Sequence, residues 1–99
     1  MQIVWDKNVV EQMRSKYTLL ELETFEVHGE PVTTYCVLPP EKAIAELPNM
    51  DALLALHQDF LDALKKQDLA LCEKFAVALT GHFGGELDTF YEEILKRLK

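Results

Sequence analysis

The segment TLLELETFEVHGEPVTTYCVL, residues 18–38, decides the fold class of this chain. Its first and last parts, residues 18–27 and 32–38, are rich in the β-branched and aromatic residues that favour strands. Between them, His28-Gly29-Glu30-Pro31 carries the residue types of a turn. The segment therefore predicts an antiparallel β-hairpin.

The apolar residues of the first predicted strand change face part-way along it. Under strict alternation Leu20 and Leu22 fall on one face, whereas Phe25 and Val27 fall on the other. A bulge near Glu23-Thr24 explains this change, and so does a strand that is covered on both faces.

Helical patterns flank the hairpin on both sides. Before it, Asp6 or Asn8 is a suitable N-cap for a helix that runs to about Lys16. After it, Pro39-Pro40 ends the second strand. The pattern then predicts helices over residues 41–47, 50–66, 68–80 and from near Gly85 to the end. We therefore expect one domain, residues 1–99, of the α+β class: an N-terminal helix, one antiparallel β-hairpin, then a C-terminal cluster of three to four helices packed on it.

Negative charge is concentrated in the first part of the chain. The net charge is −7, and between residues 17 and 64 Lys42 is the only Lys or Arg. The acidic residues of that span are Glu21, Glu23, Glu26, Glu30, Glu41, Glu46, Asp51, Asp59 and Asp62. Because such a field repels phosphate backbones, direct nucleic-acid binding is not expected, and a basic protein partner is favoured. The alternative is that the charge serves only solubility.

Composition also bears on compartment. No apolar run approaches the length of a membrane helix, and Asp6 and Lys7 interrupt any secretory signal, so we expect no membrane contact and a cytoplasmic location. Two cysteines are too few for a disulfide scaffold. Since Cys36 and Cys72 both lie in apolar runs, we expect reduced core thiols.

The side chains that bind metals or act as nucleophiles are scattered along the sequence. They are His28, Cys36, His57, Cys72 and His82. No two have the spacing of a zinc site, so no metal and no cofactor is expected. Nothing local supports a catalytic cysteine, which needs an accessible, electropositive setting. No catalytic residue is therefore assigned.

The glycine-rich loop at residues 81–85 invites comparison with a phosphate-binding loop. It lacks the Lys-Ser/Thr of such loops and follows a helix, and Glu86 and Asp88 lie where an anion would bind. We interpret it as a tight helix–helix turn with Phe83 in the core. A role for His82 and Phe83 in binding a partner stays open.

The favoured function is that of a non-enzymatic acidic interaction protein, namely a small adaptor, assembly factor or inhibitor. The proposed contact surface is the acidic hairpin half, with Glu21, Glu23, Glu26 and Glu30. One alternative is an inhibitor that imitates nucleic-acid phosphate with regularly spaced carboxylates and blocks a basic protein. Another is a small enzyme whose site lies at a dimer interface.

A two-stranded hairpin leaves both of its edges open. The strand Val32–Leu38 carries no charged residue. Such an edge is either covered by the rest of the chain or paired with its counterpart in a homodimer. We favour the homodimer, with Thr34 and Cys36 near the twofold axis.

Overall fold

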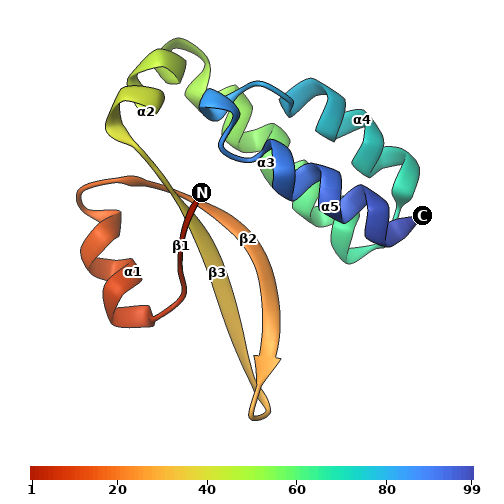
Figure 1. The fold of residues 1–99 in the computed structure, drawn as a ribbon, viewed down its shortest axis with the longest axis horizontal. Helices are drawn as coiled ribbons and strands as arrows, with labels where there is room; N and C mark the ends of the chain where they lie inside the picture. Colours follow the sequence, from red (N-terminus) through yellow and green to blue (C-terminus); the bar gives the residue numbers. More distant parts are fainter.

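The computed structural model describes all residues, 1–99, as an antiparallel sheet with helices on both of its faces (Figure 1). The strands are β1 (Gln2–Val4), β2 (Thr18–Val27) and β3 (Glu30–Leu38). The helices are α1 (Lys7–Arg14), α2 (Pro40–Glu46), α3 (Met50–Lys65), α4 (Leu69–Leu79) and α5 (Asp88–Leu98), with 3₁₀ turns at Leu47–Asn49 and Phe83–Gly85. The α+β class is confirmed. The predicted arrangement was incomplete, because β1 precedes the N-terminal helix.

The sheet has three strands in the order β1–β3–β2, so β3 lies in the centre. Cys36 of β3 is flanked by Ile3 of β1 on one side and Leu20 of β2 on the other. The expectation that Val32–Leu38 forms an open edge was therefore wrong for Tyr35–Val37, which β1 covers. A homodimer with Cys36 at its twofold axis is excluded for the same reason, because both strands beside Cys36 belong to its own chain.

A bulge in β2 explains the change of face in its sequence. The pairing with β3 shifts between Glu21 and Thr24, as the first of the two predicted alternatives requires. Beyond the shift Phe25 lies opposite Val32, which is on the same face of β3 as Cys36. The bulge consequently places the apolar residues on both sides of it on one face of the sheet, the face that α3–α5 cover. These residues are Leu20, Leu22, Phe25 and Val27.

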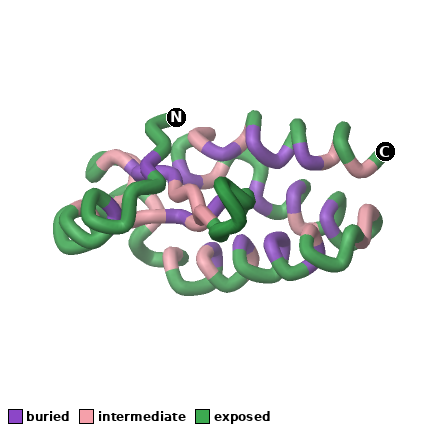
Figure 2. The backbone as a smooth tube through the Cα atoms, turned by 90° about the horizontal axis from the view of Figure 1, so that it is seen from below, coloured by how far each residue is buried: buried purple, intermediate pink, exposed green.

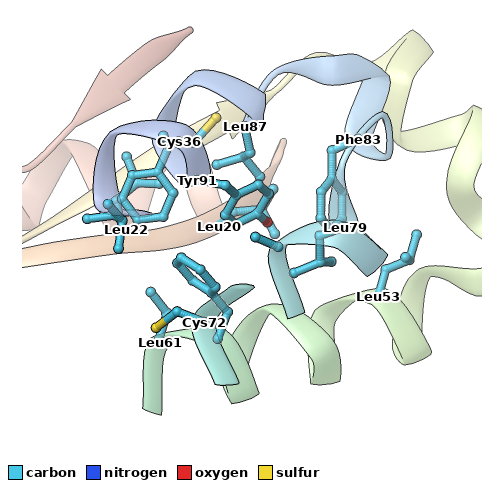
Figure 3. Packing of buried hydrophobic residues seen from close by; sticks show 14 of the residues in the cluster. Leu20, Leu22, Cys36, Leu53, Leu61, Cys72, Leu79, Phe83, Leu87 and Tyr91 are labelled. Atoms are coloured by element: carbon cyan, nitrogen blue, oxygen red, sulfur yellow. The ribbon is translucent and has the colours of Figure 1, made fainter. Parts of the chain in front are cut away.

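The main core lies between that face of the sheet and helices α3–α5 (Figures 1 and 3). Leu20 and Cys36 meet Tyr91 of α5 and Leu79 of α4 there. A smaller cluster lies on the other face, where Val10 of α1 packs on Val4 and Val37. Strand β3 is thus buried on both faces at Cys36–Leu38.

One polar side chain, His57 of α3, lies inside the main core. Its Nε2 is hydrogen-bonded to the backbone carbonyl of Glu21, and its Nδ1 lies 2.9 Å from the hydroxyl of Tyr91. Because a carbonyl can only accept, Nε2 carries the proton, and Nδ1 accepts from Tyr91. His57 therefore ties the edge of β2 to two helices of the core.

Candidate partner-binding surface

The far part of the β2–β3 hairpin extends past the helices (Figure 1). We call residues 24–33 the hairpin end. Its turn is formed by His28 and Gly29, with φ of 53° and 80°, the left-handed pair of a type I′ turn. Such a turn matches the twist of the two strands and holds the hairpin end as an extension of the sheet.

Apolar side chains on the hairpin end are exposed. Phe25 is 49 % exposed and Val27 is 45 % exposed, although both point to the same face as the buried Leu20. In Figure 2 the buried segments lie on the facing sides of the helices and in the adjoining sheet, whereas much of the rest of the surface is exposed. The apolar face of the sheet thus continues beyond its helical cover.

The four predicted contact carboxylates fall into two groups. Glu26 and Glu30 are exposed on the hairpin end. Glu21 is half-buried, and Glu23 is held by Arg97 through two hydrogen bonds of 2.6 and 2.8 Å. Glu23 is therefore neutralised within the chain, and Glu26 and Glu30 are the two of the four that are both exposed and without an ion-pair partner.

The remaining predicted contact residues lie elsewhere. Thr34 is half-buried and donates its hydroxyl to the carbonyl of Glu23 at 2.9 Å, across the bulge. His82 lies 3.2 Å from the carboxylate of Glu46, which joins the α4–α5 connection to α2. Phe83 is fully buried, which confirms its interpretation as a core residue and excludes it from direct contact with a partner.

A cavity of about 810 Å³ lies beside the hairpin end, between α1 and β3. We call it the α1–β3 groove. Its α1 wall includes Val10, Glu11 and Arg14, and its β3 wall includes Thr33 and Tyr35. Trp5, the only tryptophan of the chain, stands on its rim and is 62 % exposed. The sequence could not reveal this groove, because it forms between segments far apart in the chain.

The nucleophilic and metal-binding side chains are not gathered into a site. No group of three His, Cys, Asp or Glu side chains is placed to hold a metal ion. Cys36 and Cys72 are free and fully buried, and burial raises the pKa of Cys36 to about 11. Burial raises the pKa of Cys72 as well, so both thiols are protonated at neutral pH. No protein-family model, curated protein or solved structure matches this chain.

Other exposed apolar side chains occur away from the hairpin. Ile44 and Leu47 are exposed near α2, and Leu71 and Val77 on α4. Scattered residues of this kind are normal on a protein surface. No helix has the length and apolar content needed to cross a membrane. The hairpin end combines exposed apolar side chains and free carboxylates, and the groove lies beside it on the opposite face of the sheet from Phe25 and Val27.

Proposed function

We propose that this chain is a non-enzymatic interaction protein that binds a basic protein partner through its hairpin end. The observation that carries this proposal is the uncovered face formed by Phe25 and Val27, which continues the core face of the sheet past its helices. Exposed aromatic and aliphatic side chains with charged neighbours are typical of protein–protein contact surfaces.

The charge of the partner follows from the free carboxylates. Glu26 and Glu30 are exposed and have no ion-pair partner within the chain, unlike Glu23. Lys42, the single cation between residues 17 and 64, is bound to Glu86 and compensates neither of them. Complementary charge on a partner would accelerate its association, and salt would weaken the effect.

The two alternatives are less well supported. An imitation of nucleic-acid phosphate needs an uninterrupted row of carboxylates, whereas the Arg97–Glu23 pair interrupts the acidic strand. An enzyme at a dimer interface needs accessible reactive side chains that lie together, whereas both cysteines and His57 are buried, and the accessible His28 and His82 belong to the hairpin turn and the α4–α5 connection. Neither alternative is favoured by a specific observation.

Affinity capture from a native lysate, with two variants of equal charge, tests the proposal. The hairpin-end variant carries Glu26→Gln and Glu30→Gln, and the control carries Glu92→Gln and Glu93→Gln on the exposed side of α5. Both variants lose the same charge and should unfold at the same temperature as the wild type, because exposed charges contribute little to stability.

The expected result is that wild type and control retain the same basic protein and the hairpin-end variant retains much less of it. Raising the salt concentration should slow association of the wild type, as measured by surface plasmon resonance. Equal retention by both variants would contradict the proposal, and so would a retained partner whose association is insensitive to salt.

A further inference from the structure

Part of the inner strand β3 has a free edge. Val27 and Glu30 flank the two-residue turn and exchange backbone hydrogen bonds. Because hydrogen-bonded pairs alternate along an antiparallel ladder, the backbone N–H and C=O of Val32 also point toward β2. Pro31 and Thr33 then direct their backbone groups to the opposite side. On that side β1 ends at Val4, which is opposite Tyr35.

The backbone of Thr33 has no partner on this free edge. No hydrogen bond joins its N–H or C=O to β1 or α1, because the chain leaves the sheet after Val4 and Asp6 caps α1. Pro31 adds a free carbonyl but has no N–H. The edge therefore offers the N–H and C=O of Thr33 and, two residues away, the C=O of Pro31. An added strand can form hydrogen bonds to backbone groups spaced in this way.

The α1–β3 groove lies against this edge, since Pro31, Val32 and Thr33 line it. Its volume of about 810 Å³ is within the range of ligand sites. Val10 and Tyr35 supply an apolar floor, and Trp5 supplies an exposed aromatic rim. A strand beside Thr33 would thus have a place for the side chains on one of its faces.

A second copy of this chain is a poor occupant. In a symmetric antiparallel pair of such edges only Thr33 and its counterpart could exchange hydrogen bonds, because Pro31 lacks an N–H and Tyr35 is paired with Val4. Two chains of net charge −7 would also repel each other.

A basic segment fits the charges around the groove. The charged residues that line it are three acids, Asp6, Glu11 and Glu30, and two cations, Lys7 and Arg14. Arg14 is engaged within the wall, 5.5 Å from the centre of the Tyr35 ring and 3.9 Å from the carboxylate of Glu11, whereas Lys7 is exposed. Glu30 also lines the groove and has no ion-pair partner. Glu26, on the neighbouring strand, is exposed nearby, opposite Pro31.

We propose that an extended basic segment of the partner protein adds as a short strand beside Thr33 of β3, with an apolar side chain in the α1–β3 groove and a Lys or Arg against Glu30. This inference rests on the proposed function and adds a second contact, on the face of the sheet opposite to Phe25 and Val27. The backbone of Thr33 forms the hydrogen bonds to the added strand, and the shape and charge of the groove determine which side chains that strand can carry.

The test uses three synthetic peptides and the fluorescence of Trp5 in the full chain. The peptides are the blocked heptapeptide Lys-Val-Lys-Val-Lys-Val-Lys, the same peptide N-methylated at its valines, and its counterpart with Glu in place of Lys. Because Trp5 is the only tryptophan and stands on the rim, a peptide in the groove should shift its emission to shorter wavelength. The shift should saturate, and the N-methylated and Glu peptides should bind about tenfold more weakly or not at all.

Two matched variants locate the binding. Thr33 and Thr24 lie opposite each other, and their hydroxyls are 2.8 Å apart, but only Thr33 lines the groove. Thr33→Phe and Thr24→Phe therefore lose the same hydrogen bond and add the same ring to the same face. The first should weaken the basic peptide about tenfold by filling the groove, and the second should leave its affinity within about twofold of wild type.

Several results would overturn the proposal. They are an unchanged Trp5 spectrum at all peptide concentrations, equal affinity of the two Phe variants, or tighter binding of the Glu peptide. A Trp5 shift that depends on protein concentration without peptide would place a second copy in the groove and overturn it too. If these tests fail while the Glu26→Gln, Glu30→Gln variant still loses its partner, the proposed function stands and only the groove is excluded.

Discussion

The two sides of the hairpin differ in how their backbone edges are satisfied. On the β2 side the carbonyl of Glu21 accepts a hydrogen bond from His57, and the Glu23 carboxylate is held by Arg97. On the β3 side β1 covers Tyr35–Val37, and the backbone of Thr33 is left free. Each edge is closed over only part of its length. We call the part of the β2 edge at Glu21–Glu23, which bonds to the helices, the closed edge.

Under the proposed function, this difference lets a small sheet avoid aggregation and still accept a partner strand. Open strand edges pair indiscriminately unless they are short, charged or interrupted by proline. Here the open part contains Pro31 and stops at Tyr35, which pairs with Val4, the last residue of β1. The closed edge, in contrast, contains a bulge and accepts a hydrogen bond from the buried His57 of α3, which ties it to the helices.

The largest expected effect comes from opening the closed edge. His57→Leu should destabilise the fold by about 2–5 kcal/mol, because the carbonyl of Glu21 and the hydroxyl of Tyr91 both lose their buried partner. Urea unfolding followed by circular dichroism measures the loss.

Tyr91→Phe provides the control for that variant. It removes the hydroxyl but keeps the bond from His57 to Glu21, so it should cost about 1–2 kcal/mol. If His57→Leu lowered the free energy of unfolding no more than Tyr91→Phe does, the hydrogen bond from His57 to the Glu21 carbonyl would contribute nothing to stability. The core would then not stabilise the β2 edge at Glu21.

The hairpin and the helices after it could be predicted because their signals are local. Asp6 and Asp68 cap the helices as expected, and Gly81 has the left-handed φ of 85° that ends α4. Strand β1 was missed because Gln2–Val4 is too short to show alternation and pairs with residues more than thirty positions away. Because β1 was not predicted, Tyr35–Val37 was incorrectly expected to be an open edge.

The candidate surface could be predicted less completely. Glu26 and Glu30 are exposed as expected, but nothing local indicated that Arg97 would neutralise Glu23 from the other end of the chain. His57 occupied an apolar helical stripe in the sequence, and that placement was the available signal of a buried role. Its partners, Glu21 and Tyr91, depend on tertiary packing.

The second prediction concerns pH and again concerns the closed edge. Burial lowers the pKa of His57 below its usual 6.5, so the unfolded chain binds a proton that the folded chain rejects. The stability that neutral His57 supplies is therefore complete above about pH 6.5 and is lost as the pH falls toward the folded-state pKa.

Urea midpoints between about pH 7.5 and pH 5 measure this loss. The wild type should lose more stability over the range than His57→Leu, in which the titrating group is absent. Groups common to both chains cancel in this difference. Parallel pH profiles would mean that His57 accepts a proton in the folded chain as readily as in the unfolded one.

The smallest expected effect concerns the ion pair beside the bulge. Arg97 bonds both carboxylate oxygens of Glu23, and the hydrogen bonds to Glu23 raise the pKa of Arg97. Its side chain is nevertheless 57 % exposed, so Arg97→Ala should cost only about 0.5–1 kcal/mol and less at high salt. Lys96→Ala is the control, because Lys96 is exposed beside it and forms no ion pair. Thermal unfolding at low and high salt measures both. A loss for Arg97→Ala as large as that for His57→Leu would show that the closed edge is held by surface charge rather than by the buried histidine.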